Sequence, residues 1–280
     1  MLTIKTKRKL WPIGWRDRTC VMGVLNVTPD SFSDGGRYLD PALAEKQALK
    51  LIKQGADVLD IGAQSTRPMS SDVGSEEEIR RLKPALALIR RSNPNVLISV
   101  DTFHADVALM ALNLGVDWIN DVTGGRNDPN ILKLSAEAKC PYILTHSRGN
   151  SITMDNLANY NDVAKDVHQG LLRRTEIALN SGINADQIIW DPGLGFAKTN
   201  EQNIDIIRHI ELICSEKFPV LVGPSRKRFI GDLLNQPNPE LRIWGTVAIA
   251  CRCQLAKVSM IRVHDVDAIY QTLSMARAIF

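Results

Sequence analysis

The sequence predicts an α/β protein of one domain, built as a (β/α)8 TIM barrel. Short apolar segments alternate with segments of helical pattern along the chain, and eight such pairs follow residue 19. The apolar segments lack the polar alternation of a half-exposed strand, which is typical of a parallel sheet buried on both faces. A length of 280 residues suits a single barrel, because such domains commonly run to about 250 residues.

Each strand is expected where an apolar run rich in Val, Ile or Leu ends at a polar residue or a glycine. The expected strands are residues 20–26, 58–62, 97–101, 118–121, 142–146, 188–191, 220–223 and 260–263. Helices are expected at about 40–55, 75–91, 104–115, 130–139, 160–182, 199–213, 225–234, 239–256 and 266–280. Asp40 before Pro41 predicts an N-cap, and segments 75–78 and 199–202 fit the capping-box pattern.

A doubly wound open sheet is the alternative architecture. The unbroken series of eight units disfavours it, and so does the absence of a GxGxxG motif after the first strand. Within the predicted barrel, residues 1–18 form a basic segment that we expect to cover the bottom, and residues 19–280 form the barrel itself.

Composition and charge limit the class of function. The net charge is +3, and after residue 18 the chain has no basic run typical of nucleic-acid binding. No apolar run approaches the ~18–20 residues that span a bilayer, and residues 1–18 lack the apolar core of a secretory signal. The five cysteines form no CxxC pair and no metal-binding spacing, so we expect reduced thiols in a cytoplasmic enzyme.

Polar residues gather at the expected carboxyl ends of the strands, where (β/α)8 barrels place their active sites. They are Asn26, Asp60, Asp101, Asn120, Asp121, His146, Asp191, Ser225, Arg226, Lys227, Arg262 and His264. Taken singly, Asp60 could bond backbone amides, His146 could be an interior histidine, and Asp121 could cap the next loop. Taken together, carboxylates, amides and cations at one end of the barrel predict a planar polar ligand that carries an anionic group.

Seven motifs at these strand ends carry a family resemblance. They are NVTPDSFSDGG (26–36), DIGAQSTRP (60–68), SVDT (99–102), INDVTGG (119–125), DPGLGFAKT (191–199), GPSRKRFIG (223–231) and RVHDV (262–266). In this order they resemble dihydropteroate synthase over almost the whole chain. The resemblance implies a transferase of folate biosynthesis. Such an enzyme condenses (7,8-dihydropterin-6-yl)methyl diphosphate with 4-aminobenzoate, giving 7,8-dihydropteroate and diphosphate.

The resemblance also implies how the pterin diphosphate is bound. Asp191 would pair with the amino-oxo edge of the pterin, since a carboxylate can accept two parallel hydrogen bonds from a row of donors. The other implied ligands of this substrate are Asn26, Thr66, Asp101, Asn120, Lys227, Arg262 and His264. Arg262 would stack on the pterin face and reach the phosphates. The implied catalytic residues are Lys227, Arg262 and His264, with Mg2+ as cofactor and Asn26 as its protein ligand.

The 4-aminobenzoate site that the resemblance implies combines two polar loops with the ends of strands six and seven. Its residues are Phe32, Ser65, Thr66, Arg67, Pro68, Phe196 and Ser225. Ser225, at the start of the expected helix 225–234, would direct a helix dipole and unpaired amides at the carboxylate. The loops after the first two strands are expected to close as a lid over bound diphosphate, which predicts ordered binding.

Two other functions share part of this pattern. A pterin-binding methyltransferase barrel would keep the pterin site but lack the 4-aminobenzoate and diphosphate residues, and a silent paralogue could bind pterin without turnover. The substitutions Gln64, Met69, Thr145 and Pro224 depart from the usual family residues but leave the acid, amide and cation set intact. The resemblance further implies a homodimer, with the helices after strands seven and eight as the expected interface, and no nucleic-acid or membrane partner.

Overall fold

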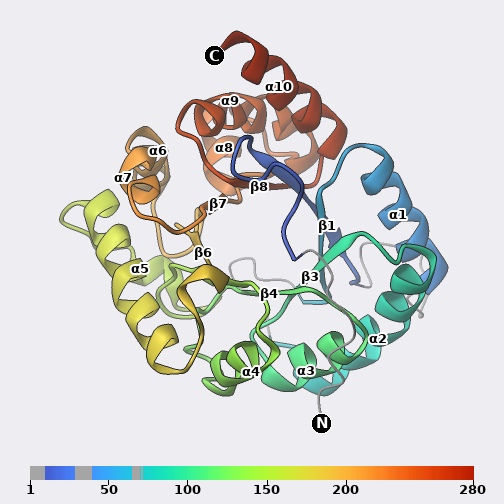
Figure 1. Ribbon diagram of the computed structural model, residues 1–280. Coiled ribbons are helices and arrows are strands. Elements are labelled where there is room, and N and C mark those ends of the chain that lie inside the picture. Colours follow the sequence, from blue (N-terminus) through green and yellow to red (C-terminus); the bar gives the residue numbers. More distant parts are fainter. Residues whose placement is uncertain (1–9, 29–39, 65–69, 71) are drawn as a thin grey trace.

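The computed structural model describes residues 10–28, 40–64, 70 and 72–280. It confirms the predicted (β/α)8 barrel as a single domain, with a ring of strands inside a ring of helices (Figure 1). The strands are β1 (Cys20–Asn26), β2 (Val58–Gly62), β3 (Leu97–Asp101), β4 (Trp118–Asp121), β5 (Tyr142–Thr145), β6 (Ile188–Asp191), β7 (Leu221–Val222) and β8 (Met260–Val263). They pair in parallel in the order β6-β5-β4-β3-β2-β1-β8-β7, and a bridge between Trp190 and Val220 brings β6 beside β7.

Helices follow the strands and cover the outside of the barrel (Figure 1). They are α1 (Pro41–Lys53), α2 (Ser75–Ser92), α3 (Ala105–Asn113), α4 (Asn130–Ala138), α5 (Val163–Asn180), α6 (Asn200–Arg208), α7 (Ile210–Cys214), α8 (Arg228–Leu233), α9 (Ile243–Leu255) and α10 (Val266–Ile279), with 3-10 turns η2 (Met154–Leu157), η3 (Ala185–Gln187) and η4 (Pro239–Arg242). Among the helices of the described ranges, none is long and apolar enough to cross a membrane.

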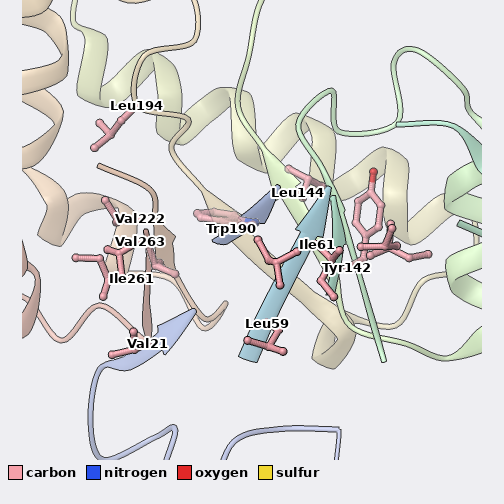
Figure 2. Packing of buried hydrophobic residues seen from close by; sticks show 14 of the residues in the cluster. Val21, Leu59, Ile61, Tyr142, Leu144, Trp190, Leu194, Val222, Ile261 and Val263 are labelled. Carbon is pink, nitrogen blue, oxygen red and sulfur yellow. The ribbon is translucent and has the colours of Figure 1, made fainter. Parts of the chain in front are cut away.

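Alternate residues of the strands build two separate apolar clusters, because successive side chains point to opposite faces of a strand. The larger cluster lies between the strands and the helices. Its members labelled in Figure 2 are Val21, Leu59, Ile61, Tyr142, Leu144, Trp190, Leu194, Val222, Ile261 and Val263. The smaller cluster fills the barrel interior toward the amino ends of the strands. It consists of Cys20, Met22, Val58, Leu97, Trp118, Ile143, Ile189, Leu221 and Met260.

Residues 10–18 lie against this inner cluster. Trp11 and Trp15 stack on each other with ring centres 4.5 Å apart and pack on the cluster. The indole nitrogen of Trp118 donates a hydrogen bond to the Leu10 carbonyl at 2.7 Å. This part of the N-terminal segment therefore covers the amino-terminal end of the barrel.

Two predicted helix starts are confirmed and one is wrong. Asp40 Oδ1 accepts a hydrogen bond from the Ala42 amide at 2.8 Å, and Thr199 forms the predicted capping box with Gln202. The capping box predicted at 75–78 is absent, because α2 begins after Gly74 without a side-chain cap. Glu78 is buried and bonds to Thr102 instead of reaching back to the helix start.

Two predicted helices have different bounds in the structure. The helix expected at 199–213 is interrupted at His209, which separates α6 from α7. The helix expected at 225–234 begins only at Arg228. Arg226 has a φ of 62°, a left-handed conformation that a right-handed helix cannot contain, and its guanidinium pairs with Asp265 at 2.9 Å.

Candidate active site

A polar layer lies directly on the inner apolar cluster. In several strands, the residue two positions after a member of that cluster is polar. These polar residues are Asp60, Ser99, Asn120, Thr145, Asp191 and Arg262. Because strand side chains repeat every two residues, these side chains also point into the barrel. The barrel interior therefore changes from apolar to polar toward the carboxyl ends of the strands, where this fold places its active sites.

Arg262 links two carboxylates of this end of the barrel. Its Nε donates to Asp60 Oδ2 at 2.5 Å, and a terminal nitrogen donates to Asp101 Oδ2 at 2.6 Å. Burial lowers the pKa of Arg262, but the charges of Asp60 and Asp101 outweigh burial and raise the pKa overall. Burial raises the pKa of Asp101, an effect that Arg262 opposes and Asp60 increases. Arg262 is thus a permanent cation held in place by two acids.

Several buried polar atoms of the layer have no hydrogen-bond partner within the described part of the chain. They are Asp60 Oδ1, Ser99 Oγ, Asn120 Oδ1 and Thr145 Oγ1. Buried polar groups are almost always paired, so such a group in a site calls for a bound molecule or water. Asn120 is oriented by its amide nitrogen, which donates to Asp60 Oδ2 at 3.0 Å. The layer therefore offers acceptors and hydroxyls to a flat polar ligand.

Asp191 ends β6 and is 8% exposed. Its Oδ1 accepts a hydrogen bond from the Gly193 amide at 2.7 Å, which fixes the carboxylate. Burial raises the pKa of Asp191, while the Gly193 bond and the charges of Lys227 and Arg262 oppose the shift. A desolvated carboxylate of this kind binds donors strongly when a ligand supplies them.

A cavity of about 500 Å3 opens at the same end of the barrel. It is lined by seven of the predicted site residues, namely Asn26, Asp101, Phe196, Ser225, Lys227, Arg262 and His264. The Lys227 ammonium lies 4.3 Å from the centre of the Phe196 ring, within the range of a cation–π contact. Two further predicted residues, Asn120 and Asp191, lie in the buried polar layer.

Ser225 and His264 contact each other at the cavity wall. The Ser225 Oγ lies 3.0 Å from His264 Nδ1 and accepts a hydrogen bond from the His264 amide at 3.2 Å. Ser225 does not occupy the helix N-terminus that the sequence predicts, because α8 begins three residues later, at Arg228. A carboxylate at Ser225 would therefore meet a turn and a hydroxyl, and not the first amides of a helix.

The remaining predicted site residues lie outside the described residues. They are Phe32, Ser65, Thr66, Arg67 and Pro68. They stay predictions from the sequence, as does the closure of the loops that carry them.

Sequence reasoning placed Asp60 among the polar strand-end residues without giving it a role in the site, and it did not identify Lys198. Asp60 bonds the side chains of Arg262 and Asn120, and not the backbone amides suggested by its sequence context. Lys198 is 4% exposed and lines the cavity. Its partners, including His146, come from segments far away in sequence or from a turn whose shape no motif predicts, so only a structure reveals them.

Comparisons with known proteins identify the family of this chain. A sequence profile described as Pterin binding enzyme matches residues 22–264, so the fold and site define a barrel enzyme of the pterin-binding class. Dihydropteroate synthase from Synechocystis sp. is 45% identical over 266 residues, which cover 95% of this chain and 92% of that protein. The chain belongs to the dihydropteroate synthase family, whose members are transferases of folate synthesis.

Solved structures support the same placement. Dihydropteroate synthase of Xanthomonas albilineans with 4-aminobenzoic acid has a TM-score of 0.88 and 38% identity, covering 94% of this chain and 93% of that one. A structure of that synthase in complex with 7,8-dihydropteroate has a TM-score of 0.85 and 36% identity, covering 94% of each chain.

Proposed function

We propose that this chain condenses (7,8-dihydropterin-6-yl)methyl diphosphate with 4-aminobenzoate, using the polar layer for the pterin and the cavity for the diphosphate and the second substrate. The observation that carries the proposal is the buried layer of unpaired polar atoms below a cavity that contains Arg262 and Lys227. The ligands of the Xanthomonas albilineans structures, 4-aminobenzoic acid and 7,8-dihydropteroate, support it.

The pterin binds with its amino-oxo edge toward Asp191 and Asn120. The carboxylate of Asp191 accepts from the ring donors, and the unpaired Oδ1 of Asn120 accepts from another. Lys227 faces the ring oxygen or nitrogen, since its charge is close enough to Asp191 to oppose the rise in the pKa of that residue. Asp101 completes the contact from β3 and is kept in place by Arg262.

The diphosphate leaves toward Arg262 and His264. A guanidinium has five N–H donors, and the bonds to Asp60 and Asp101 use two of them, so others can face phosphate oxygens. The methylene C–O bond breaks with its electron pair on the diphosphate, which leaves a cation that the pterin ring stabilises. The amine nitrogen of 4-aminobenzoate then forms the C–N bond and loses one proton. These steps need no covalent intermediate with the enzyme.

Magnesium fits this site through Asn26, which ends β1 and lines the cavity with its amide. Mg2+ prefers oxygen ligands and commonly takes one or two from the protein and the rest from phosphates and water. Within the described ranges, no group of three His, Cys, Asp or Glu side chains could hold a metal ion. The ion would neutralise charge on the departing diphosphate.

4-Aminobenzoate lies between Phe196 and the turn that carries Ser225. Phe196 supplies an apolar wall, and the stacked Lys227 ammonium lies near the incoming amine. The Ser225 hydroxyl offers a donor to the carboxylate. Phe32 and Pro68 would close the other side.

The reaction is tested by measuring dihydropteroate formation and diphosphate release together. We expect both products only when both substrates and Mg2+ are present, and we expect the Asp191→Asn variant to be inactive. A methyltransferase would release no diphosphate, and a silent paralogue would bind the pterin without turnover. Either result contradicts the proposal.

We also propose a homodimer formed through α9 and α10. These helices carry large exposed apolar side chains, with Trp244 76%, Met275 64% and Ile279 62% exposed. Large exposed apolar groups commonly mark interaction surfaces. Light scattering should give twice the mass of 31.1 kDa, and Trp244→Glu should shift the protein toward monomer, whereas a monomeric wild type contradicts this assignment.

The cytoplasm is the compartment that we propose. All five cysteines are free thiols, which supports a reducing compartment. Microscopy of a fluorescent fusion tests this location.

A further inference from the structure

Lys198 places a buried amino group among four acceptors. Its Nζ donates to the carbonyl oxygens of Gly193 and Phe196, both at 2.9 Å, and lies 3.3 Å from the carbonyl oxygen of His146. The same atom lies 3.2 Å from the Nδ1 of His146. The bonds connect the end of β5 to the turn at 192–197 that follows β6.

We propose that Lys198 is a positioning residue that holds this turn, and with it the Asp191 carboxylate and the Phe196 ring, in the geometry that binds both substrates. The inference rests on the proposed roles of Asp191 and Phe196. Lys198 belongs to the motif DPGLGFAKT (191–199), and its role is inferred here from its contacts.

The first link runs from Lys198 to Asp191 through Gly193. Lys198 holds the Gly193 carbonyl, and the amide of the same residue donates to Asp191 Oδ1 at 2.7 Å. Gly193 has a φ of 67°, and an added Cβ would lie 2.0 Å from the His146 carbonyl oxygen. The turn is therefore pressed against β5, and a shift of Gly193 would rotate the carboxylate that faces the pterin.

The second link runs from Lys198 to Phe196. The ammonium holds the carbonyl of Phe196, and the ring of that residue lies under the Lys227 ammonium. The next residue, Ala197, has a φ of 51°, so the turn contains a non-glycine residue in the left-handed region. Backbone strain of this kind persists only where neighbouring groups enforce it, and the bonds to Lys198 supply that constraint.

The charge of Lys198 explains why carbonyl oxygens can gather at this point. Three of them converge on one nitrogen, and their partial negative charges repel each other unless a cation lies between them. A buried ammonium is costly unless it is fully hydrogen-bonded, and here acceptors for all three protons are present. A side chain without N–H donors would leave these oxygens unpaired, and an uncharged donor would lack the positive charge that lies between them.

Lys198 is also the group of this cluster that titrates near neutral pH. Burial lowers its pKa to about 7, with Asp191 opposing the shift and Lys227 and two arginines adding to it. The charged and titratable groups that face it are His146, Asp191, Lys227, Arg148 and Arg126. Loss of the third proton above pH 7 removes one donor, so binding of 4-aminobenzoate by the wild type should weaken from pH 7 to pH 9.

The test compares Lys198→Met and Lys198→Gln with Lys165→Met, which removes an exposed lysine that forms a single surface ion pair. We expect each Lys198 variant to raise the KM for 4-aminobenzoate and the Kd for the pterin diphosphate by about tenfold, the effect of one lost hydrogen bond to a charged group. Hydrogen exchange should increase in segment 192–197. The KM of the variants should lose the dependence on pH between 7 and 9. Lys165→Met should match the wild type in all of these measurements.

A rescue experiment separates the charge from the packing of the side chain. Lys198→Ala should regain substrate affinity in millimolar propylammonium chloride and not in tetramethylammonium chloride, and this holds as a test if Lys198→Met does not fold. Folded Lys198 variants with both constants within twofold of wild type, or an alanine variant that neither salt rescues, overturn the inference. Asp191→Asn is the parallel arm: if it leaves pterin binding unchanged, the proposed function itself fails. If only that variant weakens binding, the role of Lys198 alone is rejected.

Discussion

The Nε of Arg262 and the amide nitrogen of Asn120 donate to the same oxygen of Asp60, at 2.5 Å and 3.0 Å. This carboxylate is completely buried and joins the cation proposed for the diphosphate to the amide proposed for the pterin. It orients both side chains before any substrate binds. Asp60 therefore organises the site without a direct role in the chemistry.

The Asp60→Asn variant tests this relationship. Removal of one partner of a buried ion pair costs about 3 kcal/mol, so the free energy of unfolding should fall by that amount. We expect pterin affinity to fall with it, because the neutral amide oxygen that replaces the carboxylate accepts the bond from Asn120 more weakly. Asp186→Asn on the exposed turn η3 is the control and should leave both quantities unchanged. Equal stability of the two variants would show that Asp60 does not hold Arg262.

Arg262 and Lys227 should divide the substrates between them. Arg262→Ala should lower kcat by a factor of about 100 or more, comparable to the loss of a group that stabilises developing charge. It should also weaken inhibition by added diphosphate. Lys227→Ala should raise the KM for either organic substrate and leave diphosphate inhibition near the wild-type value. If the two substitutions change diphosphate inhibition equally, the separate roles are wrong.

Gly193→Ala should displace the turn that follows β6. Its Cβ would lie 2.0 Å from a backbone oxygen, which cannot move without shifting β5. Gly182→Ala is the matched control, because it has a positive φ of 96° but its Cβ would meet nothing closer than 3.4 Å. Both should lose about 1–2 kcal/mol from backbone strain, and Gly193→Ala alone should also lose pterin binding. Equal pterin affinity in both variants would contradict the close packing of this turn on β5.

His146 should make stability depend on pH. Burial and the nearby Lys198 charge lower its pKa to about 2, whereas the unfolded chain protonates it near 6.5. Between these values the unfolded state binds more protons, so the free energy of unfolding falls as pH falls. From pH 6.5 to 4.5 the contribution is about 2–3 kcal/mol. Urea unfolding of the wild type and His146→Gln should give curves that converge over this range, with His209→Gln as an exposed control, and parallel curves would refute a buried neutral His146.

The strands were predictable almost to the residue because their apolar runs end at polar residues. The bounds of β1, β2 and β3 agree with the expected ranges. A strand that is buried on both faces is a continuous apolar run in the sequence, and the ends of the run mark the ends of the strand. The helix expected at 225–234 starts late because Arg226 adopts a left-handed conformation and pairs with Asp265. The two residues of this ion pair are 39 positions apart in the sequence, so a local sequence pattern cannot predict the pair.

The same contrast holds for the site, where positions on strands were predictable and long-range contacts were not. Asp191 ends β6, and Asn120 and Arg262 lie one residue before the ends of β4 and β8, so their shared location follows from the barrel topology. Asp60 lies in the middle of β2 and its partners lie 60 and 202 residues away, so a local pattern cannot reveal its contacts with Asn120 and Arg262.

The binding of the pterin diphosphate to Asp191→Ala tests the central claim most directly. Calorimetry on the wild type and on this variant measures the contribution of the one carboxylate that β6 places in the polar layer. Each ring donor left unpaired costs about 1–3 kcal/mol, so two such donors should reduce the affinity at least 30-fold while the fold persists. A variant that is folded and binds the pterin diphosphate with wild-type affinity would show that the polar layer is not the pterin site.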